Sequence, residues 1–186
     1  MHKTSRQVIT ISGDLGSGKS TVARMLAEKL GWQYYSTGMV QRQIAAELGI
    51  TTIELNQIAS SDSSIDTKID AVFQNPPWGK NPCVIDSRLA FYFLADSYKV
   101  CLTVDADIAA LRIFNDQTRT GERKYKTLKQ AQLACQTRRK LELERFKNNY
   151  DIDIENPKNY NLVVDTSSLS AEQTCDCILQ AFRKQY

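Results

Sequence analysis

Eight consecutive residues near the N-terminus, Gly13 to Ser20, constrain the fold of this chain more than any other feature. They read Gly-Asp-Leu-Gly-Ser-Gly-Lys-Ser and match the pattern G-x-x-x-x-G-K-[ST], the P-loop. The β-branched run Val8 to Ile11 precedes them as a buried strand, and apolar residues at helical spacing follow up to Gly31, which marks the helix end. A glycine-rich loop between a strand and a helix is typical of α/β proteins that bind phosphate groups.

The residue types in this loop suit a nucleoside triphosphate. Its glycines can turn backbone N–H groups toward phosphate oxygens without Cβ clashes. Lys19 can reach the β- and γ-phosphates as a point charge, and Ser20 can offer its hydroxyl to Mg²⁺. The predicted binding set is Gly13, Asp14, Leu15, Gly16, Ser17, Gly18, Lys19, Ser20 and Thr21. A glycine-rich turn without a ligand is the alternative, which the flanking strand and helix disfavour.

The rest of the chain alternates between strand and helix patterns. Further strands are expected at 33–36, 83–86, 100–104 and 161–164, and helices at 40–48, 65–73, 107–117, 127–149 and from Ser170 onward. We expect Thr51 to cap a short helix and Asp107 to cap the helix at 107–117. Ser170 and Gln173 are expected to form a capping box at the start of the last helix. This order predicts an α/β fold with a five-stranded parallel sheet flanked by helices, and ligands at the carboxyl ends of the strands.

Composition adds limits on domain number and location. The chain has 186 residues, 42% hydrophobic and 24% charged, which fits one globular domain. The first seven residues are too few and too polar for a signal peptide, and no apolar run reaches about 18 residues. We therefore expect a cytoplasmic protein without a membrane span. Five cysteines, an odd number, are expected to be reduced thiols.

Basic residues concentrate in one segment. From Arg112 to Lys147 there are 11 Lys or Arg against 4 Asp or Glu, whereas Ile44 to Asn75 holds 5 acidic residues and one lysine. Such a stretch suits the phosphates of a nucleotide or of nucleic acid. Nucleic acid is the less favoured partner, because aromatic residues for base stacking are sparse there. We expect small nucleotide substrates and a monomer.

The P-loop alone does not choose among a small-molecule kinase, a GTPase and a mechanical ATPase. The sequence lacks the Asn-Lys-x-Asp motif of GTPases, and a motor would normally need a longer chain. A kinase whose acceptor is a phosphate needs cations at two places. Arg42 and Arg88 can supply the acceptor set. Arg138 and Arg145 are seven residues apart on one helix face, with Glu142 between them, and can supply a closing lid.

Several segments together resemble a known family, the short cytidylate kinases of archaea and some bacteria, within the nucleoside monophosphate kinases. The segments are Ile11 to Gly31, Tyr35 to Gly38 with Arg42, Ile65-Asp66 with Asp70, Val84 to Ala90, Arg138 to Phe146, Tyr150 to Asp153, and Tyr160 to Ser167. The resemblance covers nearly the whole chain. It implies a single P-loop kinase domain over 1–186, with an acceptor-binding region at about 37–80 and a helical lid at about 115–150.

The resemblance also implies roles for individual residues. Ser36, Arg42 and Arg88 would hold the monophosphate, while Arg112, Arg119 and Arg138 would belong to the closing side, with Arg123 and Arg145 as further candidates. Lys19, Arg138 and Asp86 are the predicted catalytic residues, and Ser20 and Asp86 the predicted metal ligands. The implied substrates are ATP with Mg²⁺ and CMP or dCMP.

Two positions depart from the family pattern. Ser87 stands where the family usually has glycine, and Leu141 where the lid usually has serine. Two alternatives stay open, the first because residues that read the base cannot be located from spacing, and the second because of Ser87 and Leu141. One is a kinase of another nucleotide or small acceptor, and the other is a nucleotide-binding regulatory module that has lost catalysis.

Overall fold

The computed structural model describes residues 7–50, 52–59, 62–116 and 125–185. Its centre is one sheet of five parallel strands in the order β2-β3-β1-β4-β5. The strands are β1 (Val8–Gly13), β2 (Gln33–Ser36), β3 (Cys83–Asp86), β4 (Tyr98–Thr103) and β5 (Leu162–Asp165). The predicted five-stranded parallel sheet is therefore confirmed, and the strand that leads into the P-loop is the central one.

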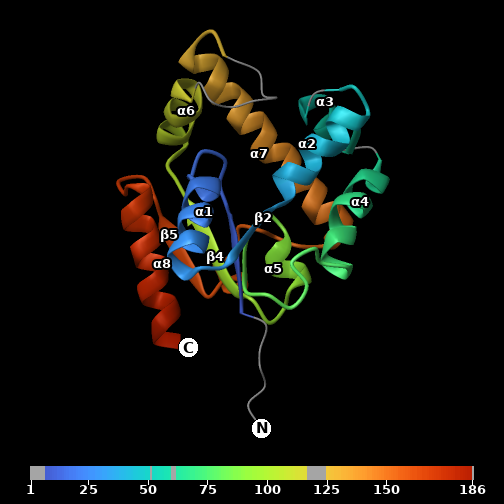
Figure 1. Ribbon diagram of the computed structural model, residues 1–186. Helices are drawn as coiled ribbons and strands as arrows, with labels where there is room; N and C mark the ends of the chain where they lie inside the picture. The colour runs from blue at the N-terminus through green and yellow to red at the C-terminus, as the bar shows by residue number, and fades with distance from the viewer. Residues whose placement is uncertain (1–6, 51, 60–61, 117–124, 186) are drawn as a thin grey trace.

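Helices surround this sheet (Figure 1). Within the described residues they are α1 (Lys19–Leu30), α2 (Thr37–Glu47), α3 (Thr52–Ala59), α4 (Ser63–Gln74), α5 (Ala90–Phe93), α6 (Ala106–Asn115), α7 (Leu128–Tyr150) and α8 (Ala171–Gln185), with a 3-10 turn η1 (Pro157–Asn159). None of these helices is both long and apolar enough to cross a membrane.

All six residues of the central strand are buried. Successive side chains point to opposite faces of the sheet, and helices cover both faces. Ile9 and Ile11 pack into a cluster with residues of α1 and α8, such as Leu26 and Ile178. Val8 belongs to a second cluster on the other face, with residues from α4 and α5. Figure 1 shows the same layers, with α1 and α8 on one side of the sheet and α4 and α5 on the other.

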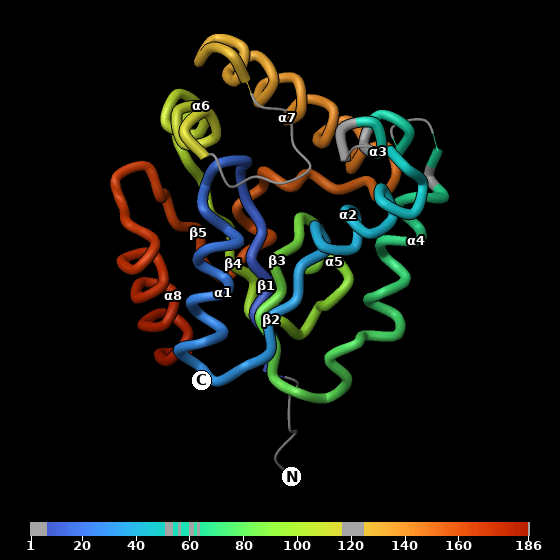
Figure 2. Tube along the Cα trace, turned by 45° about the horizontal axis from the view of Figure 1, so that its top comes forward, coloured from blue at the N-terminus to red at the C-terminus, as the bar shows by residue number. Residues whose placement is uncertain are grey.

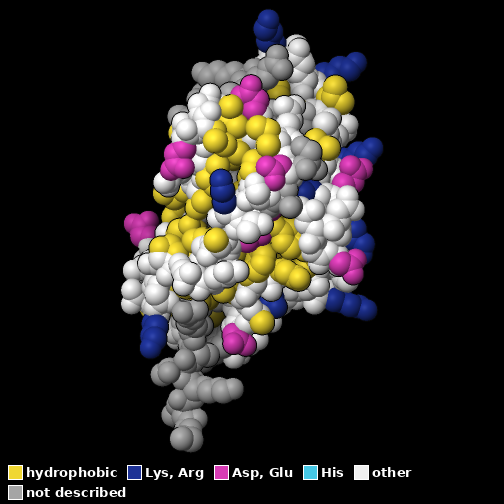
Figure 3. Space-filling view, turned by 90° about the vertical axis from the view of Figure 1, so that its right-hand side faces the viewer, with side chains coloured by type: hydrophobic (Ala, Val, Ile, Leu, Met, Phe, Trp, Pro, Cys, Tyr) yellow, Lys and Arg dark blue, Asp and Glu magenta, His cyan; other side chains and the backbone are white. Residues whose placement is uncertain are grey.

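A third cluster lies beside the sheet and joins α2, α3 and α4. It contains Ala45, Leu55, Ile65 and Ile69. Figure 3 looks onto the face that carries these helices, where hydrophobic side chains are visible between scattered charged ones. The three helices thus form a unit with its own small core, within the region predicted to bind the acceptor.

Two helix starts differ from the sequence prediction. Helix α2 begins at Thr37 and not at Val40, because β2 leads directly into the helix and Gly38 lies in its first turn, where a glycine costs little. Helix α6 is capped by Asp105 and not by Asp107. The carboxylate of Asp105 accepts hydrogen bonds from the backbone N–H groups of residues 107 and 108, at 2.9 and 3.2 Å.

Other predicted helix ends are confirmed. Gly31 ends α1 in the left-handed conformation, with φ of 65°. The Thr127 side chain caps α7 by accepting from the N–H of residue 130. Ser170 and Gln173 form the predicted reciprocal capping box at the start of α8. The expected cap Thr51 lies outside the described residues.

Candidate active site

The carboxyl ends of three neighbouring strands bring the predicted site residues together. Asp86, at the end of β3, is paired in register with Ile11 of β1 on one side and with Ser36 of β2 on the other. Two further bonds join the segments that follow: the N–H of Ser87 donates to the Ile11 carbonyl at 3.1 Å, and the Ser12 hydroxyl donates to the Arg88 carbonyl at 2.9 Å. Figure 2 shows this edge of the sheet beneath α6 and α7.

The P-loop adopts a conformation that requires glycine. Gly13, Gly16 and Gly18 have φ values of 127°, 80° and 84°. A Cβ atom added at Gly13 would lie 2.0 Å from the carbonyl oxygen of Leu102 on β4, so the loop leaves the sheet through a space that only glycine fits. Helix α1 follows directly, and its N-terminal end carries the positive pole of the helix dipole.

One backbone carbonyl holds the turn of the loop. The carbonyl oxygen of Asp14 accepts from the Ser17 N–H at 3.3 Å, from the Ser17 hydroxyl at 2.8 Å and from the Lys19 ammonium. Burial lowers the pKa of Lys19 to about 7, and the nearby Arg88 acts in the same direction. A phosphate anion at this position would favour the charged form of the lysine.

A hydroxyl and a carboxylate meet at the start of α1. The Ser20 hydroxyl donates to Oδ2 of Asp86 at 2.5 Å, and the Tyr34 hydroxyl lies 3.5 Å from the same oxygen. A serine hydroxyl and one carboxylate beside a phosphate site are the oxygen ligands with which proteins bind Mg²⁺. The two residues predicted as metal ligands are therefore adjacent and fit that ion.

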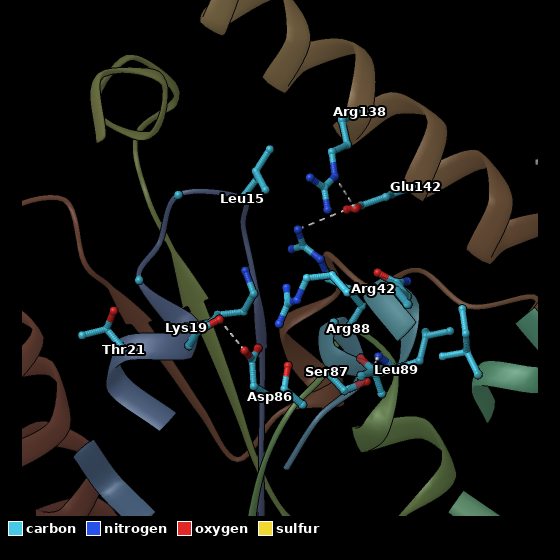
Figure 4. A pocket seen from close by; sticks show the side chains of 18 of the residues that line it. Leu15, Lys19, Thr21, Arg42, Asp86, Ser87, Arg88, Leu89, Arg138 and Glu142 are labelled. Atoms are coloured by element: carbon cyan, nitrogen blue, oxygen red, sulfur yellow. Dashed lines mark hydrogen bonds and ion pairs between the residues drawn. The ribbon is translucent and has the colours of Figure 1, made fainter. Parts of the chain in front are cut away.

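These residues line one cavity of about 680 Å³ that continues to the predicted acceptor residues. Lys19, Ser20, Thr21, Ser36, Arg42, Asp86, Arg88, Arg112 and Arg138 all line it. Figure 4 shows Lys19, Arg42 and Arg88 converging on the space beneath α7, from which Arg138 and Glu142 extend toward Arg88. The sequence analysis expected Arg42, Arg88 and Arg138 to face the P-loop, and the cavity brings these residues together.

The acceptor side of the cavity is built from α2 and the segment after β3. Ser36 is buried at the N-terminal end of α2, where backbone N–H groups are unpaired within the helix. Arg42 lies about one turn into that helix, close to Gly38. Arg88 lies beyond Asp86 and forms an ion pair with Glu142 of α7 at 3.3 Å. Two cations and a helix N-terminus thus face one space.

The far end of the cavity carries acidic and apolar side chains from α4 and α7. Asp66 is buried and pairs with Arg145 at 3.6 Å, and it accepts a hydrogen bond from Asn149 at 3.0 Å. Asp70 accepts from the Tyr150 hydroxyl. Burial raises the pKa of Asp70 to about 6, despite that hydrogen bond.

Ile69 and Phe146 also line this end and supply apolar surface. The end thus combines carboxylates with apolar side chains.

Arg112 lies on the P-loop side of the cavity and not on the acceptor side. Its guanidinium donates to the Thr166 carbonyl at 2.7 Å and to the Gly16 carbonyl at 3.4 Å, which ties α6, the P-loop and the segment after β5 together. The predicted residues Arg119 and Arg123 lie outside the described residues.

Sequence reasoning missed one contact between the lid helix and the P-loop. Arg139 pairs with the Asp14 carboxylate at 3.0 Å and with Glu155 at 2.8 Å, and the N–H of Val104 donates to the other Asp14 oxygen. The side chain of Arg139 is 26% exposed. A run of three basic residues, 138–140, carries no signal that its middle member faces the P-loop.

The two departures from the family pattern differ in where they lie relative to the cavity. Ser87 is buried and its backbone is not in the left-handed region, since Asp151 is the only non-glycine residue with positive φ among the described residues. The Ser87 hydroxyl accepts from the Leu89 N–H at 3.3 Å. Leu141 is 43% exposed and is not among the residues that line the cavity. Ser87 lines the cavity, whereas Leu141 lies outside it.

A central P-loop strand, the 2-3-1-4-5 strand order and helices on both faces define a P-loop kinase fold. Solved structures agree. A shikimate kinase from Bacteroides thetaiotaomicron superposes with a TM-score of 0.67 and 14% identity, over 95% of this chain and 98% of the other. At this identity the likeness shows the fold alone.

The sequence narrows the class further. The model of the cytidylate kinase-like family matches residues 8–78 and 59–168. A cytidylate kinase from Aeropyrum pernix is 37% identical over 175 residues, which is 94% of this chain and 98% of the relative. The chain therefore belongs to the cytidylate kinase-like family, as the sequence resemblance predicted.

A longer relative also matches. An S-adenosylmethionine-dependent nucleotide dehydratase from Lacinutrix mariniflava is 35% identical over 95% of this chain, but the chain spans only 36% of its length. Family membership and the kinase fold support a nucleotide kinase that uses ATP.

Proposed function

We propose that this chain transfers the γ-phosphate of ATP to CMP or dCMP, giving ADP and CDP or dCDP. The observation that carries the proposal is the single cavity, in which the P-loop residues Lys19 and Ser20 face the acceptor-side residues Arg42 and Arg88. A cavity that has phosphate-binding side chains on both the donor side and the acceptor side suits a reaction in which a phosphoryl group passes from one phosphate to another.

The P-loop would hold the triphosphate. Its backbone and the N-terminal end of α1 would bind the phosphate oxygens, with Lys19 on the β- and γ-phosphates. Ser20 and Asp86 would hold Mg²⁺, which supplies charge neutralisation at the phosphates. Arg112 lies beside Gly16, so we assign it to the triphosphate and not to the acceptor.

The acceptor phosphate would lie between Ser36, Arg42 and Arg88. One of its oxygens forms a bond to the γ-phosphorus as the bond from that phosphorus to the β-γ bridging oxygen breaks, and the bridging oxygen leaves with ADP. The acceptor is already an anion, so the step needs no strong general base. The protein contributes orientation and cationic side chains, with Arg138 closing over the transferred group.

The acidic end of the cavity favours a base that carries an amino group. Asp66 and Asp70 can accept hydrogen bonds from the amino group of cytosine, whereas uracil presents a carbonyl oxygen there. Ile69 and Phe146 offer apolar surface for the ring. This arrangement supports CMP or dCMP over UMP, and it leaves AMP and GMP as competing acceptors because adenine and guanine also carry an amino group.

A steady-state assay with ATP, Mg²⁺ and a panel of CMP, dCMP, UMP, AMP and GMP tests the proposal. We expect the highest kcat/KM for CMP or dCMP. A higher value for AMP or GMP would make the chain a kinase of another nucleotide. Binding of ATP and CMP without diphosphate product would instead favour the regulatory module.

A further inference from the structure

One carboxylate lies at the centre of the cationic wall of the cavity. Glu142 is only 7% exposed, and each of its two oxygens serves a different arginine. Oε2 lies 3.3 Å from Nη2 of Arg88, and Oε1 lies 3.2 Å from Nε of Arg138. Arg88 follows β3, whereas Arg138 and Glu142 both lie on α7. The ion pair of Glu142 with Arg88 therefore connects the lid helix to the edge of the sheet (Figure 4).

The charge of Glu142 is permanent at neutral pH. Burial alone raises the pKa of a carboxyl group, but Arg88, Arg138 and Lys19 outweigh that effect and lower the pKa of Glu142 to about 2. The shared buried carboxylate attracts both guanidinium groups and so offsets the repulsion between them. Without that carboxylate, Arg88 and Arg138 would repel each other within the site.

Arg88 has an unmatched hydrogen-bond donor on its other side. Its Nη1 atom is buried and has no partner within the described part of the chain, whereas Nη2 faces Glu142. A guanidinium is planar, so fixing one nitrogen fixes the direction of the other. A buried donor without a partner is costly, and an anionic oxygen that reached it would remove that cost.

We infer that Glu142 is a positioning residue, which holds Arg88 and Arg138 in the orientation in which they bind the phosphate groups of the substrates. This inference rests on the proposed function, because it takes the two arginines as phosphate ligands. It adds a role for a side chain that need not touch either nucleotide. An acidic residue among phosphate ligands would otherwise repel the substrate.

The test compares CMP with cytidine, which lacks the phosphate, by titration calorimetry on wild type and Glu142→Gln. We expect the variant to bind CMP about 10- to 100-fold more weakly, since hydrogen bonds between charged groups are disturbed, and to bind cytidine as the wild type does. Glu144→Gln is the matched control, because Glu144 is exposed on the same helix and pairs only loosely with Lys140, at 3.9 Å. It should bind both ligands normally.

A second variant, Glu142→Asp, keeps the charge but shortens the side chain by one methylene. We expect it to bind CMP more weakly than the wild type, because the shorter side chain cannot span both arginines, and to bind cytidine unchanged. If Glu142→Gln does not fold, Glu142→Asp alone tests the inference.

Unchanged CMP affinity in a folded Glu142→Gln protein overturns the inference. So does tighter CMP binding, which would mean that the carboxylate competes with the phosphate. Normal CMP binding by Glu142→Asp also overturns it, because charge alone would then suffice. Failure of the proposed function looks different: the wild type itself would then form no CDP from CMP in the acceptor panel.

Discussion

The two ends of the cavity are built in different ways. The triphosphate end, residues 13–21, is a continuous segment whose shape comes from backbone dihedral angles and from one carbonyl group that accepts three hydrogen bonds. The acceptor end consists of side chains from α2, α4, α7 and the segment after β3. Ion pairs such as Arg88 with Glu142 and Arg145 with Asp66 hold these side chains together.

The geometry of the two ends is therefore maintained by different forces. A backbone loop is fixed by local sterics and keeps its shape as long as its glycines remain. A constellation of side chains depends on the packing of four elements and on the balance of buried charges. We therefore expect substitutions in the triphosphate end to act on chemistry or on local strain, and substitutions in the acceptor end to act on stability and substrate affinity together.

The largest effect is expected at Lys19. Lys19→Ala removes the cation predicted to neutralise the transferred phosphate, and kcat should fall on the order of 10³-fold. A coupled assay for ADP formation measures this, with circular dichroism to show that the variant is folded. Near-normal phosphoryl transfer by a folded variant would contradict the proposed role of the triphosphate end.

At the acceptor end, Glu142→Gln should lower the free energy of unfolding by about 3–5 kcal/mol at pH 7, because Arg88 and Arg138 lose their buried counterion. The pKa of Glu142 is lowered from 4.5 to about 2 in the folded protein. The advantage of wild type over variant is therefore fully present above pH 4.5 and disappears as the pH falls toward 2.

Urea unfolding at pH 7 and at pH 3 measures this difference. Glu144→Gln serves as the control, and as a surface change it should alter stability by less than about 0.5 kcal/mol. A difference between wild type and Glu142→Gln that stays constant between pH 7 and pH 3 would argue against the ion pairs as its cause.

Two glycines of the triphosphate end distinguish contact from backbone strain. Gly13→Ala should cost about 3 kcal/mol or more, because its Cβ would meet backbone atoms of Leu102 on the neighbouring strand. Gly18→Ala should cost only about 1–2 kcal/mol, because no atom lies within 4 Å of its Cβ and only the positive φ is strained. Thermal unfolding of the pair checks the order, and equal losses would show that contact with β4 is unimportant.

The smallest effect is expected where the lid helix meets the P-loop. Arg139 is partly exposed and its partner Glu155 more so, at 26% and 54% of their side-chain surfaces. Arg139→Ala should therefore change the free energy of unfolding by no more than about 1 kcal/mol, and less in high salt. Unfolding at two salt concentrations tests this, and a loss above 2 kcal/mol would make the contact a structural link between the two ends.

The same contrast explains what could be predicted from the sequence. The P-loop, its strand and its helix could be recognised because their signals are local, and Asp86 because it follows a strand. The ion pair of Glu142 with Arg88 could not be predicted, because the two residues are 54 positions apart in the chain and come together only when the helices pack on the sheet. Glu142 was predicted to lie between two lid arginines, but its partner across the cavity has no signature in spacing. Asp105 as the cap of α6 was missed because Asp107 offered the same side chain two residues later.

The hydrogen bonds from Ser12 and Ser87 that tie the first and third strands together have a consequence for how such proteins diversify. They fix the segment carrying Arg88 to the strand that leads into the P-loop, independently of the helices that surround the rest of the acceptor. Mutations in α4, which carries Asp66 and Asp70, can therefore reshape the pocket for a new acceptor without disturbing the distance over which the phosphoryl group travels. In this architecture substrate preference can drift during evolution while the transfer geometry is inherited unchanged.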